Sequence, residues 1–221
     1  WGGISWSQEW TSTGPEGVPA KVNEEALLAG SSSIYQSLRA GAALAELMGD
    51  PQPEWELAGG RLGHALREHR DLFMDMSTFS MDWYYPVLGG AVRGEPAFEL
   101  LATRWDDFVM PGLGIRCVDT NPWVTGAETC ELVMSLDALG DRERALELYS
   151  DMQHLRGERG RYWTGSVHPE HVMWPNEQTS YTAAAVILAA DELSRTTPGG
   201  GIMAGDTLAD HFAELGQDCG C

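Results

Sequence analysis

Carboxylates stand close to tryptophans at several places along this sequence. Three such pairs are Asp82 with Trp83, Glu128 with Trp123, and Glu177 with Trp174. Acid–base cleavage of a glycosidic bond uses two carboxyl groups, one of them kept protonated by an apolar neighbour. Aromatic faces also stack on sugar rings. We therefore expect the catalytic pair among Asp82, Glu128 and Glu177, although acids at such positions also serve as helix caps.

A second set of polar and aromatic side chains lies in or near the same segments. We expect these residues to bind substrate: Tyr35, Trp83, Tyr84, Tyr85, Asp119, Trp123, Glu131, Trp163, Trp174 and Tyr181. Their aromatic members could stack on a sugar or stabilise a carbocation through their π faces. Packing in the core is the other interpretation of the same aromatics.

Helices must position these residues, because four segments share one pattern. Each begins with polar and aromatic residues and ends apolar; they span residues 30–49, 78–94, 122–140 and 175–193. Their starts recur at roughly 45 to 55 residues, as in helix-pair repeats. Between them lie amphipathic segments at 54–70, 95–109 and 141–156. Helices that are apolar all round are buried, whereas amphipathic helices cover them.

Two layers of helices predict an all-α fold, an α/α toroid of the six-hairpin type. The starts of the inner helices would converge at one end of the ring, where their free N–H groups favour binding. About four hairpins are visible, so we expect an N-terminal part of about two hairpins to precede Trp1. The toroid domain would span residues 1–203, followed by an acidic tail at 204–221, and no segment predicts a confident strand.

Charge and composition limit the classes of partner that the protein could bind. The formal net charge is −19 with only 14 Lys and Arg, which argues against nucleic acid and anionic membranes as partners. No apolar run approaches the roughly 18 residues of a membrane span. The four cysteines do not indicate a disulfide scaffold, which favours a cytoplasmic protein. His168 and His171 lie in a Pro-bounded loop that predicts no metal site, and we expect no metal or cofactor.

Part of the sequence resembles a known group of proteins. Residues 148–163 (LYSDMQHLRGERGRYW) are similar to the glutamine–tryptophan repeat of squalene–hopene cyclases and protein prenyltransferases, through Gln153, Gly160 and Trp163. Residues 31–38 (SSSIYQSL), 81–90 (MDWYYPVLGG) and 122–133 (PWVTGAETCELV) resemble actinobacterial proteins labelled prenyltransferase. The likeness covers nearly all of residues 1–203 and implies a helical toroid, an architecture shared with six-hairpin glycosidases.

The catalytic motifs of those enzymes are absent. The sequence has no DxDD motif to protonate a terpene and no DDxxD motif to hold magnesium on a diphosphate. Cys117 and Asp119 stand in the reverse of the order that the zinc site of protein prenyltransferases requires. The resemblance therefore describes the fold better than the chemistry.

Three functions remain open. We favour an enzyme that cleaves a glycan or glycoconjugate with carboxylates, because acids pair with tryptophans and cations are scarce. The alternatives are an isoprenoid enzyme (a prenyltransferase or terpene cyclase) and a non-catalytic binding toroid. The partner is in each case expected to be a small molecule, a glycan or an isoprenoid, and the oligomeric state is not predicted.

Overall fold

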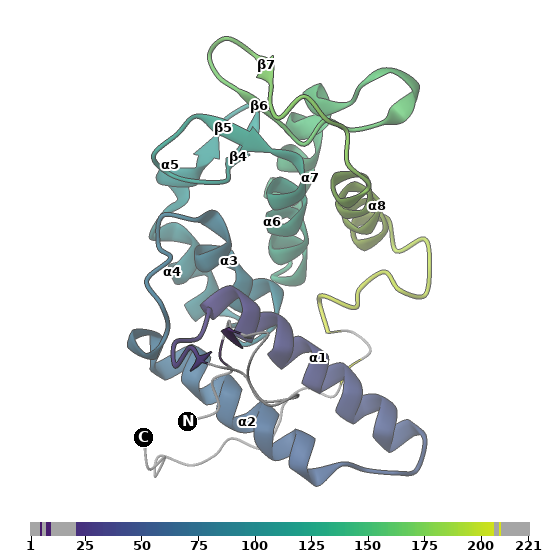
Figure 1. Cartoon of the computed structure of the whole chain (residues 1–221). Coiled ribbons are helices and arrows are strands. Elements are labelled where there is room, and N and C mark those ends of the chain that lie inside the picture. Colours follow the sequence, from purple (N-terminus) through teal and green to yellow (C-terminus); the bar gives the residue numbers. More distant parts are fainter. Residues whose placement is uncertain (1–4, 6–7, 10–20, 206–207, 209–221) are drawn as a thin grey trace. The chain divides into compact units, whose positions relative to one another are not determined.

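The computed structural model describes residues 5, 8–9, 21–205 and 208 of the chain (Figure 1). They form two compact units, one before residue 77 and one over residues 77–208. Most of the predicted tail at 204–221 lies outside the described residues. No helix in the described part has both the length and the apolar character needed to cross a membrane.

The first unit is a helical hairpin with a short β-ribbon. Its elements are β1 (Gln8–Glu9), β2 (Lys21–Val22), α1 (Leu28–Leu47), α2 (Pro53–Glu68) and the 3-10 helix η1 (Arg70–Leu72). Glycines let the two helices approach closely: a Cβ on Gly63 would lie 2.6 Å from the ring of Tyr35, and one on Gly41 would lie 3.5 Å from Trp55. Tyr35 is buried in this contact.

The second unit combines helices with a small sheet. Its helices are α3 (Ser80–Leu88), α4 (Glu95–Ala102), α5 (Trp105–Phe108), α6 (Gly126–Ala138), α7 (Arg142–Asp151), α8 (Ser180–Ser194) and the 3-10 helices η2 (Met152–Leu155) and η3 (Glu158–Gly160). Its strands are β3 (Val109–Met110), β4 (Gly114–Arg116), β5 (Trp123–Thr125), β6 (Gly165–Val167) and β7 (Val172–Met173).

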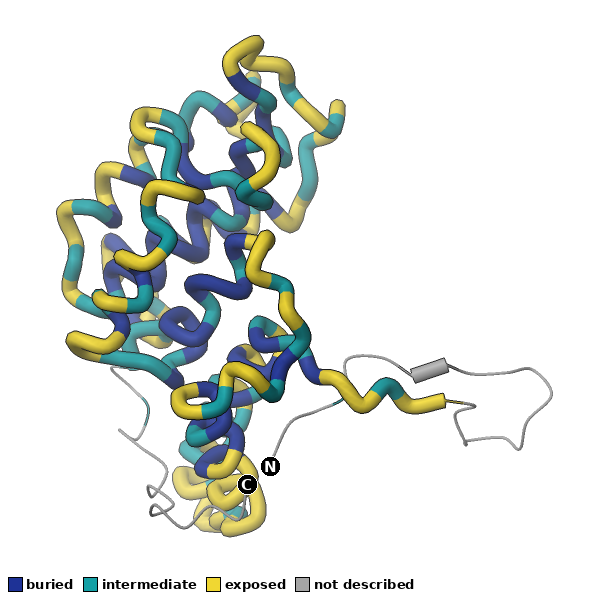
Figure 2. The backbone as a smooth tube through the Cα atoms, turned by 90° about the vertical axis from the view of Figure 1, so that its left-hand side faces the viewer, coloured by how far each residue is buried: buried dark blue, intermediate teal, exposed yellow. Residues whose placement is uncertain are grey.

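Helix α6 is the centre of the second unit. It packs against α3, α7 and α8, and nearly all of its residues are buried, including Leu132, Val133 and Leu136. The outer helices α4 and α7 bury one side each. In Figure 2 the buried stretches of this unit gather in its interior, while the connecting loops are largely exposed.

Helices occur in all of the predicted segments, but the segment 95–109 is divided into α4, α5 and the first residue of β3. The expectation that the segments 30–49 and 175–193 are buried all round was wrong. Helix α1 leaves Leu44 and Leu47 exposed, and α8 leaves Ile187 and Leu188 exposed.

The expectation that the chain has no confident strand was wrong. Strands β3 to β7 form an antiparallel sheet in the order β3-β4-β5-β6-β7. Each strand is two or three residues long, too short for an alternating pattern to appear in the sequence. The described structure is mostly helical with this sheet added, and the closed toroid stays a prediction.

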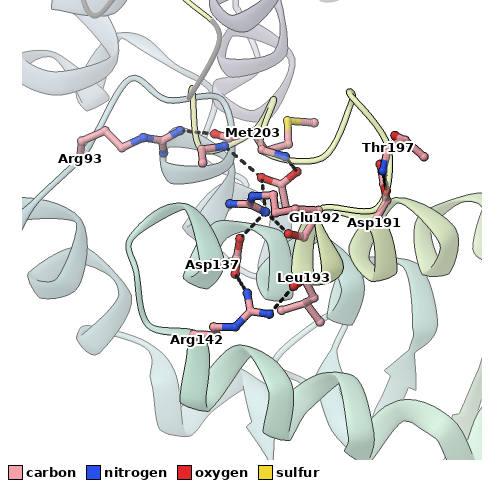
Figure 3. A network of polar contacts seen from close by, with 11 residues as sticks. Arg93, Asp137, Arg142, Asp191, Glu192, Leu193, Thr197 and Met203 are labelled. Atoms are coloured by element: carbon pink, nitrogen blue, oxygen red, sulfur yellow. Dashed lines mark hydrogen bonds and ion pairs between the residues drawn. The ribbon is translucent and has the colours of Figure 1, made fainter.

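A polar network ties the segment after α8 to the ends of two helices (Figure 3). Buried Glu192 accepts hydrogen bonds from the backbone N–H groups of Gly201 and Ala204. Asp137, in the last turn of α6, pairs with Arg142 at 3.0 Å and Arg195 at 2.8 Å. A carboxylate is unfavourable at a helix C-terminus, because that end of the helix dipole is negative. The positive charges of the two arginines offset this repulsion.

Candidate functional site

The starts of three helices meet beside the sheet. Helix α6 follows β5 without a break, and the N–H of its first residue, Gly126, donates to the carbonyl of Thr164. Helix α3 begins where the N–H of Ser80 donates to the carbonyl of Cys117, just after β4. Helix α8 touches the start of α6, since a Cβ on Gly126 would lie 2.8 Å from Thr182. The second unit therefore brings three of the predicted helix starts together (Figure 1).

A buried carboxylate joins these three helices. Glu131 of α6 accepts a hydrogen bond at 2.5 Å from the hydroxyl of Tyr84 on α3. Its other oxygen accepts from Tyr85 of α3 and from Tyr181 of α8, both at 3.1 Å. Glu128 lies one helical turn before Glu131 on the same side of α6. We call Tyr84, Tyr85, Glu128, Glu131 and Tyr181 the carboxylate–tyrosine cluster.

Burial makes Glu131 an unusual acid. Only 8% of its surface is exposed, and this desolvation raises the pKa of the carboxyl group from 4.5 to about 7. The hydrogen bond from Tyr84 lowers that pKa, the negative charge of Glu128 raises it, and the bonds from Tyr85 and Tyr181 lower it further. Near neutral pH this group is therefore poised between acid and carboxylate.

The tyrosines and a cysteine around the acids stay protonated. Burial raises the pKa of the hydroxyls of Tyr84, Tyr85 and Tyr181 above the ordinary value of 10, and the charge of Glu131 raises it further. Burial also raises the pKa of the Cys117 thiol to about 12, helped by the nearby charge of Glu128 and a hydrogen bond to it. These groups act as hydrogen-bond donors to the two carboxyl groups, not as nucleophiles.

Two aromatic residues and one acid lie next to the cluster in the chain. The rings of Trp123 and Trp174 meet edge to face, with their centroids 4.9 Å apart. Glu177 is exposed in the loop before α8, where its carbonyl accepts from the N–H of Thr164 at 3.3 Å. Thr164 in turn accepts from the start of α6, so Glu177 lies near the helix starts.

Other expected site residues have structural contacts. Trp83 stacks on Phe108 in the core and donates its indole N–H to the carbonyl of Leu100. Asp119 pairs with Arg104 at 2.5 Å.

The remaining expected site residues are dispersed. Asp82 is buried in the first turn of α3, and Trp163 lies in the loop before β6, where its N–H donates to the carbonyl of Leu155. Tyr35 belongs to the first unit. Of the resembled motif, Gln153 accepts a hydrogen bond from the hydroxyl of Tyr162.

A cluster of histidines includes two residues of the β6–β7 connection, His168 and His171, together with His154 of η2. His168 is buried, and its ring lies edge to face with those of His154 and His171 at 5.6 and 4.5 Å. No group of three or more potential ligands in the described part of the chain is arranged to hold a metal ion. The imidazoles touch one another by their ring edges and faces.

Comparison with known proteins points to glycan chemistry. No family model matches the chain. Over 203 residues it is 59% identical to the MMP endo-(1,4)-3-O-methyl-alpha-D-mannosidase of Mycolicibacterium hassiacum. That relative is named as a mannosidase. The match covers 92% of this chain and 56% of the relative, so the chain spans little more than half of the relative's length. The relative's name describes an enzyme that acts on a glycan.

Proposed function

We propose that this chain carries the acid–base centre of a glycoside hydrolase that cleaves α-(1→4) linkages between 3-O-methylated mannose units. One observation carries the catalytic assignment: Glu131, with a pKa raised to about 7, lies one turn from Glu128. A carboxyl group that burial keeps protonated, with a second carboxyl group beside it, is the arrangement that acid–base cleavage of a glycosidic bond uses. The linkage and the methylated sugar come from the name of the relative.

In this scheme Glu131 is the general acid. It donates its proton to the glycosidic oxygen while the bond from that oxygen to the anomeric carbon breaks. The carboxylate left on Glu131 keeps the hydrogen bonds from Tyr84, Tyr85 and Tyr181, which stabilise its negative charge. The tyrosines thus favour proton release at the moment when the leaving sugar needs a proton.

Glu128 is the nucleophile in this scheme. Its carboxylate attacks the anomeric carbon and forms a glycosyl ester, which water cleaves after giving a proton back to Glu131. Residues three apart on a helix place their Cβ atoms roughly 5–6 Å apart. This neighbouring placement on one face of α6 is the reason for proposing the retaining mechanism, in which the two carboxyl groups stand close together, over the inverting one.

The contacts of Glu131 also argue against the two alternatives. Thr179 caps α8 with its side chain, and Glu131 lies beyond the first turn of α6. Glu131 instead accepts hydrogen bonds from three hydroxyls, so it does not serve as a helix cap. A buried acid surrounded by hydroxyls is also a poor lining for an isoprenoid, which would need an apolar surface.

The test is hydrolysis of a 3-O-methylmannose α-(1→4)-oligosaccharide by the full-length protein, with products followed by mass spectrometry. We expect Glu128→Gln and Glu131→Gln each to lower kcat/KM by about 10²–10⁴-fold. An aryl mannoside with a good leaving group should restore much of the activity of Glu131→Gln, because that leaving group needs no proton. The same substrate should not rescue Glu128→Gln.

The matched control is Glu147→Gln, a change to an exposed acid on the outer helix α7 that should leave hydrolysis unchanged. Wild-type rates in both Glu128→Gln and Glu131→Gln would contradict the proposal.

A further inference from the structure

Trp123 and Trp174 form a fixed corner of two indole rings. Their planes cross at 79°, with the ring centroids 4.9 Å apart. The indole N–H of Trp123 donates to the carbonyl of Trp174 at 2.7 Å. Trp174 is 53% exposed, although a tryptophan is a large apolar side chain that folding tends to bury.

The backbone holds this corner in place. The N–H of Trp174 donates to the carbonyl of Gly165 at 3.0 Å. A Cβ on Gly165 would lie 2.4 Å from the carbonyl oxygen of Val124 and 2.6 Å from the indole nitrogen of Trp123. Only glycine at position 165 lets β5 and the ring of Trp123 come this close to β6. The two rings are therefore held in a fixed arrangement, as a binding surface requires.

The corner is joined to the carboxylate–tyrosine cluster on both sides. Trp123 opens β5, which runs directly into α6 and Glu128. The carbonyl of Trp123 accepts from the N–H of Cys117, whose thiol lies close enough to Glu128 for that carboxyl group to raise the pKa of the thiol. Trp174 lies just ahead of the loop that leads into α8 and Tyr181. A sugar chain held at Glu128 and Glu131 would thus have neighbouring units within reach of the corner.

The chemistry of a methylated sugar fits a corner of this kind. The C–H face of a pyranose stacks on an aromatic ring, and an O-methyl group adds an apolar contact while removing a hydroxyl donor. Two indole faces near a right angle can cover the sugar face and the methyl group together. We propose that Trp123 and Trp174 form a subsite that binds a 3-O-methylated mannose unit next to the cleaved bond and selects it over the unmethylated sugar. This assignment rests on the function proposed above.

The test compares two oligosaccharides, α-(1→4)-mannose with and without 3-O-methyl groups. We expect Trp174→Ala to raise KM for the methylated sugar by about tenfold, to change kcat much less, and to reduce the preference for methylation. Trp174→Phe, which keeps an aromatic ring, should retain most of the affinity. Val172→Ala is the matched control, since Val172 lies on the same hairpin and is 54% exposed.

Binding and hydrolysis are measured separately, so that the subsite and the proposed activity can fail independently. Hydrolysis by the wild type with an unchanged KM in Trp174→Ala would overturn the subsite and leave the hydrolase standing. Binding of the methylated sugar that depends on Trp174, without hydrolysis by the wild type, would support the subsite and remove the proposed activity. Equal affinity of the wild type for both sugars would overturn the selection. Circular dichroism checks that each variant is folded.

Discussion

At Glu131, opposing effects act on one protonation state, and burial is the largest of them. Burial and the charge of Glu128 favour the neutral acid, while hydroxyls from Tyr84, Tyr85 and Tyr181 favour the carboxylate. Hydroxyl donors bind a carboxylate more strongly than they bind a neutral acid. The pKa near 7 is the outcome of this balance, so changing one donor should move it in a known direction.

Tyr84→Phe tests that balance. The hydrogen bond from Tyr84 lowers the pKa of Glu131, so its loss should raise that pKa further. A general acid works only while protonated, so activity should fall as pH rises through about 7 in the wild type. In Tyr84→Phe that fall should come at higher pH, as a pH profile of kcat/KM would show.

Tyr162→Phe is the control for this change, because Tyr162 donates to Gln153 and makes no contact with the cluster. If activity in Tyr84→Phe falls at the same pH as in the wild type, or at a lower pH, Glu131 is not the general acid.

The stability of the fold should also depend on the pKa of Glu131. A carboxyl group with a raised pKa contributes stability below its unfolded value of 4.5, and this contribution is lost as pH rises through about 7.

Residue types and spacing predicted which side chains lie together better than they predicted the environment of each. Glu128, Glu131, Tyr84, Tyr85 and Tyr181 were all expected near the helix starts, and the structure brings them together. The shifted acid was not predictable, because the pKa of Glu131 depends on burial and on hydroxyls from two other helices. Trp83 shows the converse: its neighbours in sequence suggested binding, whereas packing places it in the core.

At the scale of the elements, we expect the stability of the β6–β7 hairpin to depend on pH. His168, in the connection between the two strands, is hydrogen bonded to Ser166, and the rings of His154 and His171 lie against its ring. Burial lowers the pKa of His154 and His168 below 6.5, and His171 lowers both further. Glu170 raises the pKa of His168, and Asp151 raises that of His154. Bases with depressed pKa values stabilise the fold above their unfolded pKa, and this stability is lost as pH falls below about 6.5.

His171→Asn should weaken this loss. Removing the imidazole of His171 removes one cause that depresses the pKa of His154 and His168, so both should rise toward 6.5. His171 has a φ of 55°, a conformation that asparagine tolerates. Urea unfolding at about pH 5 and 7 should show a smaller decrease in the free energy of unfolding than in the wild type.

Glu170→Gln should have the opposite effect, because its carboxylate favours protonated His168. If the free energy of unfolding decreases equally in both variants between about pH 7 and 5, the histidine cluster is not the cause of that decrease.

Element length explains what the sequence could predict of the fold. Helices such as α6 and α7 extend over several turns, so the contrast between an apolar and an amphipathic segment was visible. Strands such as β4 hold three residues, and their pairing depends on partners far along the chain, as when β5 pairs with β6. The sheet could therefore be found only from the tertiary structure.

At the scale of the whole molecule, the dominant property is a formal charge of −19. Such a field repels anions and has little effect on a neutral sugar. If the substrate is a neutral methylated glycan, its KM should change by less than about twofold when the salt concentration rises from about 50 to 500 mM. Steady-state kinetics over that range measure the effect directly.

A carboxylated analogue of the same oligosaccharide is the informative control. Repulsion by the acidic protein should weaken its binding at low salt, and screening should then lower its KM as salt rises. A strong salt dependence for the neutral sugar would mean that charge contributes to its recognition, which stacking on Trp123 and Trp174 does not require. Salt sensitivity confined to the carboxylated analogue would place substrate recognition in apolar contacts and hydrogen bonds.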